Sequence, residues 1–443
     1  MMIHSFRTPG LGDQTYLLEH EGRAILVDPQ RDIARFLNEA AARDLELRFV
    51  LETHLHNDYV SGAEQAALRT GAELVLPAAA AAAYRYTPAF HLEELMGEDG
   101  LSIRPLHTPG HTPEHTSYVI LLDGKEVAVF SGGSLLVGSA GRPDLLGPER
   151  AETLARLQHQ SLHRLADLPG DVELLPTHGE GSFCTSSGAG LYTSTIAEEV
   201  ASNPLLRITD PDEMAKEMLR LPMPIPGFYR YMGPTNTLGV APMSQQTTPV
   251  LTLKDLADRE LNVVDIRPRQ HQATGLVPGS VGVEMGIDFG SWAGWLLPYN
   301  EPVAIVADPD QDVEEAIVQL AQIGFDSVVG VVSELPVGGL GPGFTLVELD
   351  EAVKLVDDDV QVLDVRMPSE LKQVRLPGAV ERFVPDVFTV GTPQDLDPSA
   401  TILVACASGR RASISASRLV AAGFSDVRVL TGAGVSDLAS EAA

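Results

Sequence analysis

Cysteine is scarce in this sequence. Only Cys184 and Cys406 occur in 443 residues, and they lie far apart along the chain. We therefore expect no structural disulfide, and free thiols favour a reducing compartment, which makes the cytoplasm the expected location. The chain also lacks any apolar run near the ~20 residues that a membrane-spanning helix needs, and its first residues lack a secretory signal. We expect no membrane partner.

Positively charged residues are also few. The 31 Lys and Arg residues stand against 61 Asp and Glu, which gives a formal net charge of −30. A nucleic-acid partner is excluded, because its phosphates would be repelled. The same charge repels anionic small molecules at long range, so an anionic substrate needs a locally basic pocket. The length of the chain predicts about three domains.

The first part of the chain alternates between short β-type runs and helical patterns. The predicted strands are 24–27, 47–51, 74–76, 118–122, 127–130 and 172–175, and the predicted helices are 33–43, 62–70 and 151–165. We also expect a helix over the alanine run 78–83. A Pro-, Met- and Gly-rich segment, 185–247, is expected to form a connector that packs on the N-terminal domain, with one helix at 212–219.

Two α/β units follow, and they resemble copies of each other. Residues 263–267 (VVDIR) match 362–366 (VLDVR), and a Pro-Gly turn and a late Gly-Phe pair are repeated in the same order. Self-similarity at a separation of about one hundred residues predicts a tandem pair of domains.

Histidines gather where predicted strands end. His54, His56 and Asp58 directly follow the strand 47–51, and His111 and His178 lie in later turns. In alternating backbone His54 and His56 point the same way, so both imidazoles can reach one ion. A polar loop that happens to carry histidines is the alternative.

The second cysteine lies in a distinctive loop. Cys406 stands between an apolar strand and a helix predicted to begin near Arg411. The helix dipole and inward-pointing amide groups favour the thiolate there, and Arg410 and Arg411 add positive charge. The same amide groups and positive charges can stabilise a persulfide anion or bind a sulfur oxyanion. A buried, inert cysteine is the alternative.

This loop, with Asp364, Arg366 and the Pro-Gly turn at 377–378, resembles the rhodanese family of sulfurtransferases. The resemblance implies a rhodanese domain over 345–443, in which Cys406 carries sulfane sulfur and Arg410 and Arg411 belong to the catalytic loop. A cysteine-dependent phosphatase is the main alternative for this architecture, but its loop has one more residue between the cysteine and the arginine.

In the first α/β copy, the residue aligned with Cys406 is Asp308, which cannot carry sulfur. We therefore expect residues 248–338 to form an inactive rhodanese-like domain.

The segments 54–58, 108–112, 141–145 and 177–179 together resemble the metallo-β-lactamase fold, and more narrowly persulfide dioxygenases fused to two rhodanese domains. The resemblance implies an α/β chain: an N-terminal αββα sandwich over 1–184, then two α/β rhodanese-like domains with parallel central sheets. It further implies one Fe(II) held by His54, His111 and an aspartate. At the aspartate position this chain has Gly133, and Tyr59 stands where hydrolases of the fold carry a histidine.

Hydrolases of the fold bind two metals, and both departures remove ligands of the second one. We therefore expect one divalent metal, Fe(II) or Zn(II), and no dinuclear site. His54, His56 and His111 could form a three-histidine zinc site, and Asp58 or His178 could instead complete a set with one carboxylate. An empty site is a further alternative. The candidate substrate-pocket residues are Tyr59, Cys184 and Arg142.

These features together favour an enzyme of sulfur metabolism. Its N-terminal domain would act on a small persulfide, and Cys406 would exchange sulfane sulfur with thiosulfate, sulfite or a thiol. Two alternatives remain: a mononuclear zinc thioesterase of the glyoxalase II type, and a metal-free scaffold attached to an active rhodanese. Analogy with the family also suggests a homodimer.

Overall fold

The computed structural model describes residues 1–186, 191–220, 223–243, 247–259, 261–336, 338–358 and 360–441. They form two compact units, residues 1–244 with 321–324, and residues 245–320 with 325–443. Parts of the expected connector, residues 187–190, 221–222 and 244–246, lie outside the described residues. None of the helices in the described ranges is long and apolar enough to cross a membrane.

The N-terminal unit contains two six-stranded sheets. The first has the order β1 (Met2–Thr8), β2 (Asp13–His20), β3 (Arg23–Val27), β4 (Glu46–Leu51), β5 (Glu73–Pro77) and β6 (Thr87–Ala89). The second has the order β14 (Ser194–Thr195), β13 (Glu173–Pro176), β10 (Lys125–Gly132), β9 (Thr116–Leu122), β8 (Leu101–His107) and β7 (Leu95–Met96). A small hairpin, β11 (Leu135–Leu136) and β12 (Ser139–Ala140), follows β10.

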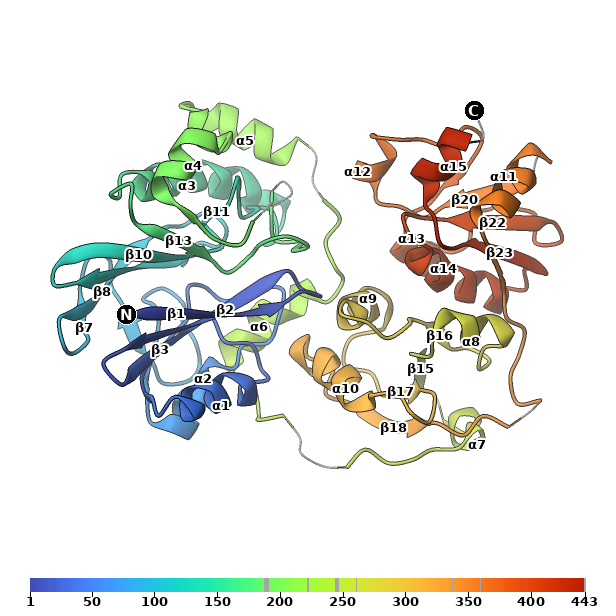
Figure 1. Cartoon of the computed structure of the whole chain (residues 1–443), viewed down its shortest axis with the longest axis horizontal. Coiled ribbons are helices and arrows are strands. Elements are labelled where there is room, and N and C mark those ends of the chain that lie inside the picture. The colour runs from blue at the N-terminus through green and yellow to red at the C-terminus, as the bar shows by residue number, and fades with distance from the viewer. Residues whose placement is uncertain are drawn as a thin grey trace. The chain divides into compact units, whose positions relative to one another are not determined.

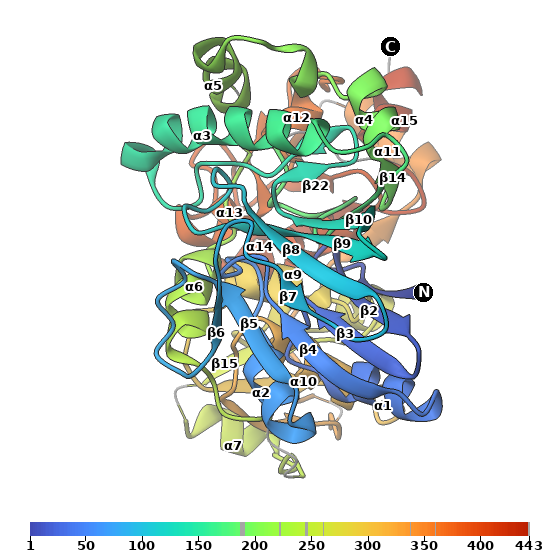
Figure 2. The same cartoon turned by 90° about the vertical axis from the view of Figure 1, so that its left-hand side faces the viewer.

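Helices cover the outer faces of both sheets (Figures 1 and 2). On the first sheet these are α1 (Ala34–Ala42) and α2 (Ala63–Thr70), and on the second they are α3 (Pro148–Ala166), α4 (Ile196–Ser202) and α5 (Pro211–Leu219). A 3₁₀ turn, η1 (Leu205–Arg207), and α6 (Tyr229–Leu238) complete the unit. This arrangement is the expected αββα sandwich.

Strand β9 shows how the sequence builds these layers. Tyr118 and Ile120 enter the core between the two sheets, whereas Val119 and Leu121 enter the core beneath α3. Successive side chains of a strand point to opposite faces, so a strand that is covered on both sides must be apolar throughout.

The alanine run 78–83 is not a helix, contrary to the sequence-based expectation. The chain turns after β5, Ala81 adopts a positive φ of 54°, and the Ala83 N–H donates to the Thr237 carbonyl over 2.7 Å. Helix propensity is a weak preference, and a run this short cannot sustain a helix without packing partners.

The C-terminal unit holds two parallel sheets. The first module has the strand order β16 (Val281–Gly282), β15 (Asn262–Asp265), β17 (Val303–Val306) and β18 (Val328–Val332), with helices α7 (Leu253–Ala257), α8 (Arg269–Thr274), α9 (Phe289–Leu296) and α10 (Val313–Gln322). The second module has β21 (Val380–Glu381), β20 (Gln361–Asp364), β22 (Thr401–Ala405), β23 (Asp426–Leu430) and β19 (Thr345–Val347). Its helices are α11 (Leu349–Asp357), α12 (Pro368–Leu371), α13 (Val384–Thr389), α14 (Arg410–Ala421) and α15 (Val435–Glu441). The shared strand order supports the tandem interpretation.

The strand registers correct one expectation about the first module. Asp265 pairs with Val306 in the first sheet, and Asp364 pairs with Ala405 in the second. The residue that follows the paired strand is therefore Ala307 in the first module and Cys406 in the second. Ala307, not Asp308, therefore occupies the cysteine position, and the same separation of 99 residues joins Asp265 to Asp364 in the sequence. An alanine is equally unable to carry sulfur.

A buried ion pair recurs at the end of the central strand in each module. Arg366 binds Asp364 (Nη2 to Oδ2, 2.7 Å) and donates to the Val374 carbonyl over 2.6 Å. In the first module Arg267 and Asp265 make the same contact at 2.6 Å. These residues tie the loop after the strand to the sheet, so their geometry indicates a structural role.

Replacing Arg366 with methionine leaves Asp364 buried without its cation. We expect this change to lower the free energy of unfolding by about 3–5 kcal/mol, seen as a lower urea midpoint. The matched variant Arg375→Met breaks an exposed pair with Glu381 and should cost at most about 1 kcal/mol. Equal midpoints for the two variants would contradict a structural role for the buried pair.

Candidate metal centre and thiol loop

Loops from both sheets of the N-terminal unit bring four histidines and several acidic residues together. His54 and His56 follow β4, His111 lies between β8 and β9, and His178 follows β13. All four are fully buried. The ring centroids of His54 and His111 lie 4.9 Å apart, and those of His111 and His178 lie 5.3 Å apart.

The tautomer of His54 is fixed by its hydrogen bonds. The Thr53 hydroxyl donates to Asp28 Oδ2 over 2.7 Å, and its oxygen lies 2.9 Å from His54 Nδ1. Since the hydroxyl has already used its one proton, it must accept from His54 Nδ1. The Nε2 atom of His54 therefore carries a free lone pair.

His111 and His178 are held in the same way. His111 Nδ1 donates to the Arg142 carbonyl over 2.9 Å, and His178 Nδ1 donates to Asp13 Oδ1 over 2.8 Å. A carbonyl and a carboxylate can only accept, so Nε2 is the unprotonated nitrogen in both rings. Among the described residues, His111 Nε2 is buried without a hydrogen-bond partner.

These three imidazoles fit a single divalent metal. One ring nitrogen of each of His54, His111 and His178 lies within 4.8 Å of the others. The Nε2 atoms of His54 and His178 are 3.4 Å apart, where two lone pairs repel. Nitrogen ligands of one tetrahedral ion are separated by about the same distance. Burial holds the pKa of His54 far below its usual range and lowers that of His111 to about 3, so both rings are neutral.

His56 lies at the edge of this centre and faces acidic groups. Its Nε2 is 3.0 Å from the Tyr59 hydroxyl, 3.1 Å from Glu52 Oε2 and 3.4 Å from Asp28 Oδ1. Burial alone would lower the pKa of His56, but the Asp28 and Glu52 carboxylates outweigh it and raise that pKa well above its usual value. His56 also belongs to two further groups of possible ligands, one with Asp28 and His54 and one with Asp58 and His178.

On the second-metal side, Asp58 lies between His178 and Cys184. Its Oδ2 is 3.3 Å from His178 Nδ1 and accepts from the Cys184 thiol over 3.3 Å. Burial raises the pKa of Asp58 to about 6 and raises that of Cys184 as well. Tyr59 donates to the Asp28 carbonyl over 3.2 Å, so its hydroxyl supports the loop beneath His56.

Gly133 leaves no room for a side chain. Its N–H donates to His115 Nε2 over 2.9 Å, and His115 Nδ1 contacts the Thr108 hydroxyl at 2.9 Å. A Cβ atom on Gly133 would lie 2.3 Å from His111 Cδ2. The His111 ring occupies the space of the expected aspartate, and His115 is engaged at both nitrogens.

Arg142, a candidate pocket residue, braces loops instead of facing open space. It pairs with Asp144 through two 2.7 Å contacts and donates to the Met223 carbonyl, also over 2.7 Å. Helix α6 contributes Asn236, whose side chain donates to the His56 and Tyr59 carbonyls over 2.8 Å. The segment after residue 185 thus helps to hold the histidine loop.

A cavity of about 830 Å³ adjoins the histidine loops. Its walls are largely apolar, and its polar lining includes Asn57, Glu114, Arg150 and Arg230. The amide nitrogen of Asn57 is buried without a partner in the described part of the chain. Sequence reasoning missed these four residues, because they lie far apart along the chain and no motif joins them.

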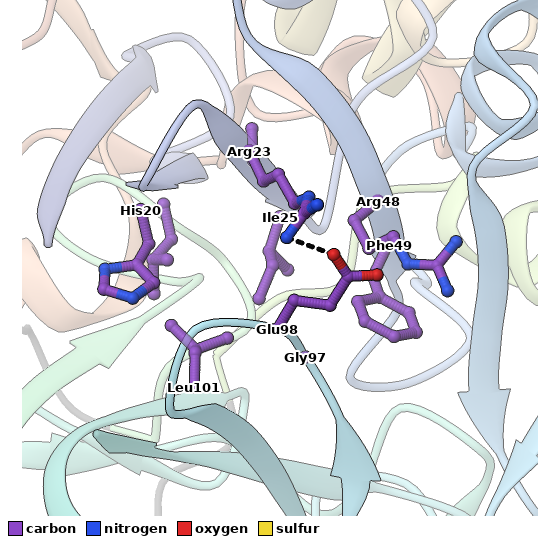
Figure 3. Close-up of a pocket in the computed structure, with 10 residues that line it drawn as sticks. His20, Arg23, Ile25, Arg48, Phe49, Gly97, Glu98 and Leu101 are labelled. Carbon is purple, nitrogen blue, oxygen red and sulfur yellow. Dashed lines mark ion pairs between the residues drawn. The ribbon is translucent and has the colours of Figure 1, made fainter. Parts of the chain in front are cut away.

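A second pocket lies at the opposite end of β3 and β4 (Figure 3). Arg23 forms an ion pair with Glu98 across it, beside His20 and Phe49. Its space of about 20 Å³ holds no more than a water molecule, so it is not a substrate site.

In the C-terminal unit, the thiol loop starts where β22 ends. Cys406 is buried, and the Gly409 N–H donates to its Sγ over 3.1 Å. Gly409 has a φ of 86°, a conformation that favours glycine, and α14 begins at the next residue. Arg411 binds both oxygens of Glu370, and Arg410 points to Asp288, with Nη2 to Oδ1 at 2.8 Å.

A cavity of about 130 Å³ lies beside this loop, lined in part by Arg366, Glu370, Ala407 and Asp437. Burial alone would lower the pKa of Arg411, but Glu370, and then Cys406, outweigh it.

Known proteins match both regions. The family model of the metallo-beta-lactamase superfamily matches residues 9–178, and that of the rhodanese-like domain matches residues 348–436. The hydroxyacylglutathione hydrolase of Anaeromyxobacter dehalogenans is 30% identical over 236 residues, which span 47% of this chain and 88% of that protein. This chain belongs to the metallo-beta-lactamase superfamily. A rhodanese domain follows its metallo-β-lactamase domain.

Two further matches support the fold. A probable metallo-hydrolase of Burkholderia pseudomallei is 26% identical over 269 residues, covering 51% of this chain and 89% of that protein. The crystal structure of a metallo-beta-lactamase from Staphylococcus aureus subsp. aureus COL has a TM-score of 0.68 and 24% identity. That match covers 75% of this chain and 99% of the S. aureus chain, and it concerns the fold alone.

The variant Gly133→Ala tests the metal centre. Its Cβ must displace the His111 ring from the Arg142 carbonyl, and we expect about tenfold weaker metal retention against a competing chelator. The matched variant Gly227→Ala meets no atom within 4 Å and should bind metal normally. His111→Ala should lose the metal. Normal retention by both Gly133→Ala and His111→Ala would contradict this centre.

Proposed function

We propose that this chain is a two-part enzyme of sulfur metabolism, resembling a persulfide dioxygenase fused to a thiosulfate sulfurtransferase. The observation that carries the proposal is the Cys406 loop, in which Sγ accepts the Gly409 N–H at the start of α14 within a rhodanese domain. Backbone donors at a helix start stabilise an anionic sulfur, which both the thiolate and the persulfide forms need.

The transfer needs no cofactor. The Cys406 thiolate attacks the outer sulfur of thiosulfate, a new S–S bond forms, the original S–S bond breaks, and sulfite leaves with the electron pair. A second thiolate, sulfite or cyanide then attacks the terminal sulfur of the Cys406 persulfide. The electron pair returns to Cys406, so the enzyme is regenerated without net oxidation.

The N-terminal domain is proposed to act on the persulfide of a small thiol. His54, His111 and His178 would hold one divalent metal, Fe(II) or Zn(II), which supplies Lewis-acid or redox chemistry when bound. Asp13 and the Arg142 carbonyl orient two of these rings. In the adjoining cavity, Arg150 and Arg230 provide the local positive charge that an anionic substrate needs against the net charge of the chain.

One observation favours a second candidate function. The ligand group His54, His111 and His178 contains no carboxylate, and three imidazoles are a typical ligand set for zinc. Several curated relatives carry the name hydroxyacylglutathione hydrolase. A mononuclear zinc thioesterase is therefore the alternative for the N-terminal domain, with the rhodanese domain as its partner.

The variant Cys406→Ser tests the sulfurtransferase proposal. Serine cannot form a persulfide, so we expect cyanide- and sulfite-dependent sulfur transfer to fall to background. Cys184→Ser provides the matched control, because Cys184 lies in the other unit and its loss should leave transfer intact. Wild-type turnover in Cys406→Ser would refute the role of this thiol.

Oxygen uptake tests the N-terminal half. With glutathione persulfide as substrate, we expect oxygen consumption by the iron-loaded protein that is lost in His111→Ala. Cleavage of a glutathione thioester by zinc-loaded protein, without oxygen uptake in either metal form, would replace the dioxygenase proposal with the thioesterase.

A further inference from the structure

The first module of the C-terminal unit reaches the thiol loop of the second. Arg269, the first residue of α8, donates from Nη1 to the Ser408 carbonyl over 3.0 Å. The two modules also meet at β16 and α14, where the Gly282 N–H donates to Ser417 Oγ over 3.1 Å (Figure 1). A module without a cysteine thus contacts the loop that holds Cys406.

The contact matters because of the geometry of one peptide group. The Ser408 carbonyl and the Gly409 N–H belong to the same planar, trans peptide, so they point in opposite directions. The N–H end is bound to Cys406 Sγ at 3.1 Å, and the carbonyl end is bound to Arg269 at 3.0 Å. If this peptide rotated, the sulfur would lose its donor.

The Arg269 guanidinium is itself held in place. Its Nε donates to Glu284 Oε2 over 2.7 Å, and the side chain is mostly buried. The planar fork of arginine lets Nε bind the carboxylate while Nη1 reaches the carbonyl, an arrangement that lysine cannot copy. A cation on the carbonyl oxygen also polarises the peptide and strengthens its N–H as a donor.

Neighbouring contacts reinforce this arrangement. Arg410 Nη2 donates to the Glu284 carbonyl over 2.7 Å and pairs with Asp288 Oδ1 at 2.8 Å. A Cβ atom on Gly409 would lie 2.8 Å from Arg269 Nη1. The first module therefore holds the loop on both sides of Gly409.

We infer that Arg269 is a positioning residue for sulfur transfer, which fixes the Ser408–Gly409 peptide with its N–H directed at the Cys406 sulfur. The inference rests on the proposed function of Cys406. It gives the first module, which carries Ala307 at the cysteine position, a part in the chemistry of the second. Arg269 acts through the Ser408–Gly409 peptide, and Cys406 remains the residue that carries the sulfur.

The test uses the full-length variant Arg269→Gln with two readouts. We expect sulfur transfer to fall about tenfold, the loss typical of a hydrogen bond to a charged group. We also expect slower alkylation of Cys406 by iodoacetamide, followed by mass spectrometry of its peptide, with the pH midpoint of alkylation moved upward. Arg259→Gln removes an exposed arginine from the same module and should change neither readout.

Two additional variants separate positioning from folding. Arg269→Lys keeps the charge without the fork and should restore part of the rate. Glu284→Gln leaves the guanidinium but removes the carboxylate that orients it, so transfer should fall by a smaller factor. Because these changes are milder, they report on the loop even if Arg269→Gln fails to fold.

The outcomes distinguish this inference from the proposed function. If Arg269→Gln and Glu284→Gln both keep wild-type transfer and alkylation, the positioning role is overturned. If the wild-type protein transfers no sulfur but Arg269→Gln still slows alkylation, the positioning of the thiol stands and the sulfurtransferase proposal falls.

Discussion

The buried carboxylate of Asp28 is the group on which the histidine centre depends. It follows β3 and accepts from the Thr53 N–H and the Thr53 hydroxyl, both over 2.7 Å, and from the Thr177 hydroxyl. Thr53 and Thr177 immediately precede His54 and His178. One carboxylate thereby joins the ends of β3, β4 and β13 and sets where two candidate ligands emerge. Burial alone would raise the pKa of Asp28, but His56 and these donors outweigh it and keep that pKa low.

The electrostatics of the centre favour a bound cation. Asp13, Asp28, Glu52 and Asp58 are all buried within the same small region. Burial, the largest cause in each case, raises the pKa of Asp13, Glu52 and Asp58, because the charged form of a carboxylate is disfavoured away from water. A divalent ion offsets both this charge and the repulsion between facing imidazole lone pairs. The histidines and carboxylates of this region are therefore positioned for a metal.

Much of the fold and the histidine cluster could be predicted, because periodicity and local motifs are properties of neighbouring residues. Tyr118 to Leu121 alternate between two cores, and His54 and His56 share one short loop. What could not be predicted depends on contacts across long separations. Asp13 and Asp28 are single acidic residues without a motif, and the turn at Ala81 is set by packing. The Ala307 position, by contrast, could have been predicted, because the separation of 99 residues between Asp265 and Asp364 also joins Ala307 to Cys406.

The divergence of the first module follows from the same kind of long-range contact. The residue two places after the buried arginine is Pro368 in the second module and Arg269 in the first. In each module the buried ion pair holds the start of the following helix. The residue two places after the arginine therefore has a fixed position. Proline there can donate no hydrogen bond, whereas arginine reaches Ser408, 139 residues further along the chain. The module that lacks the thiol thus carries the guanidinium that the thiol loop contacts. A contact of this kind is a physical reason for the chain to keep a module that lacks the thiol.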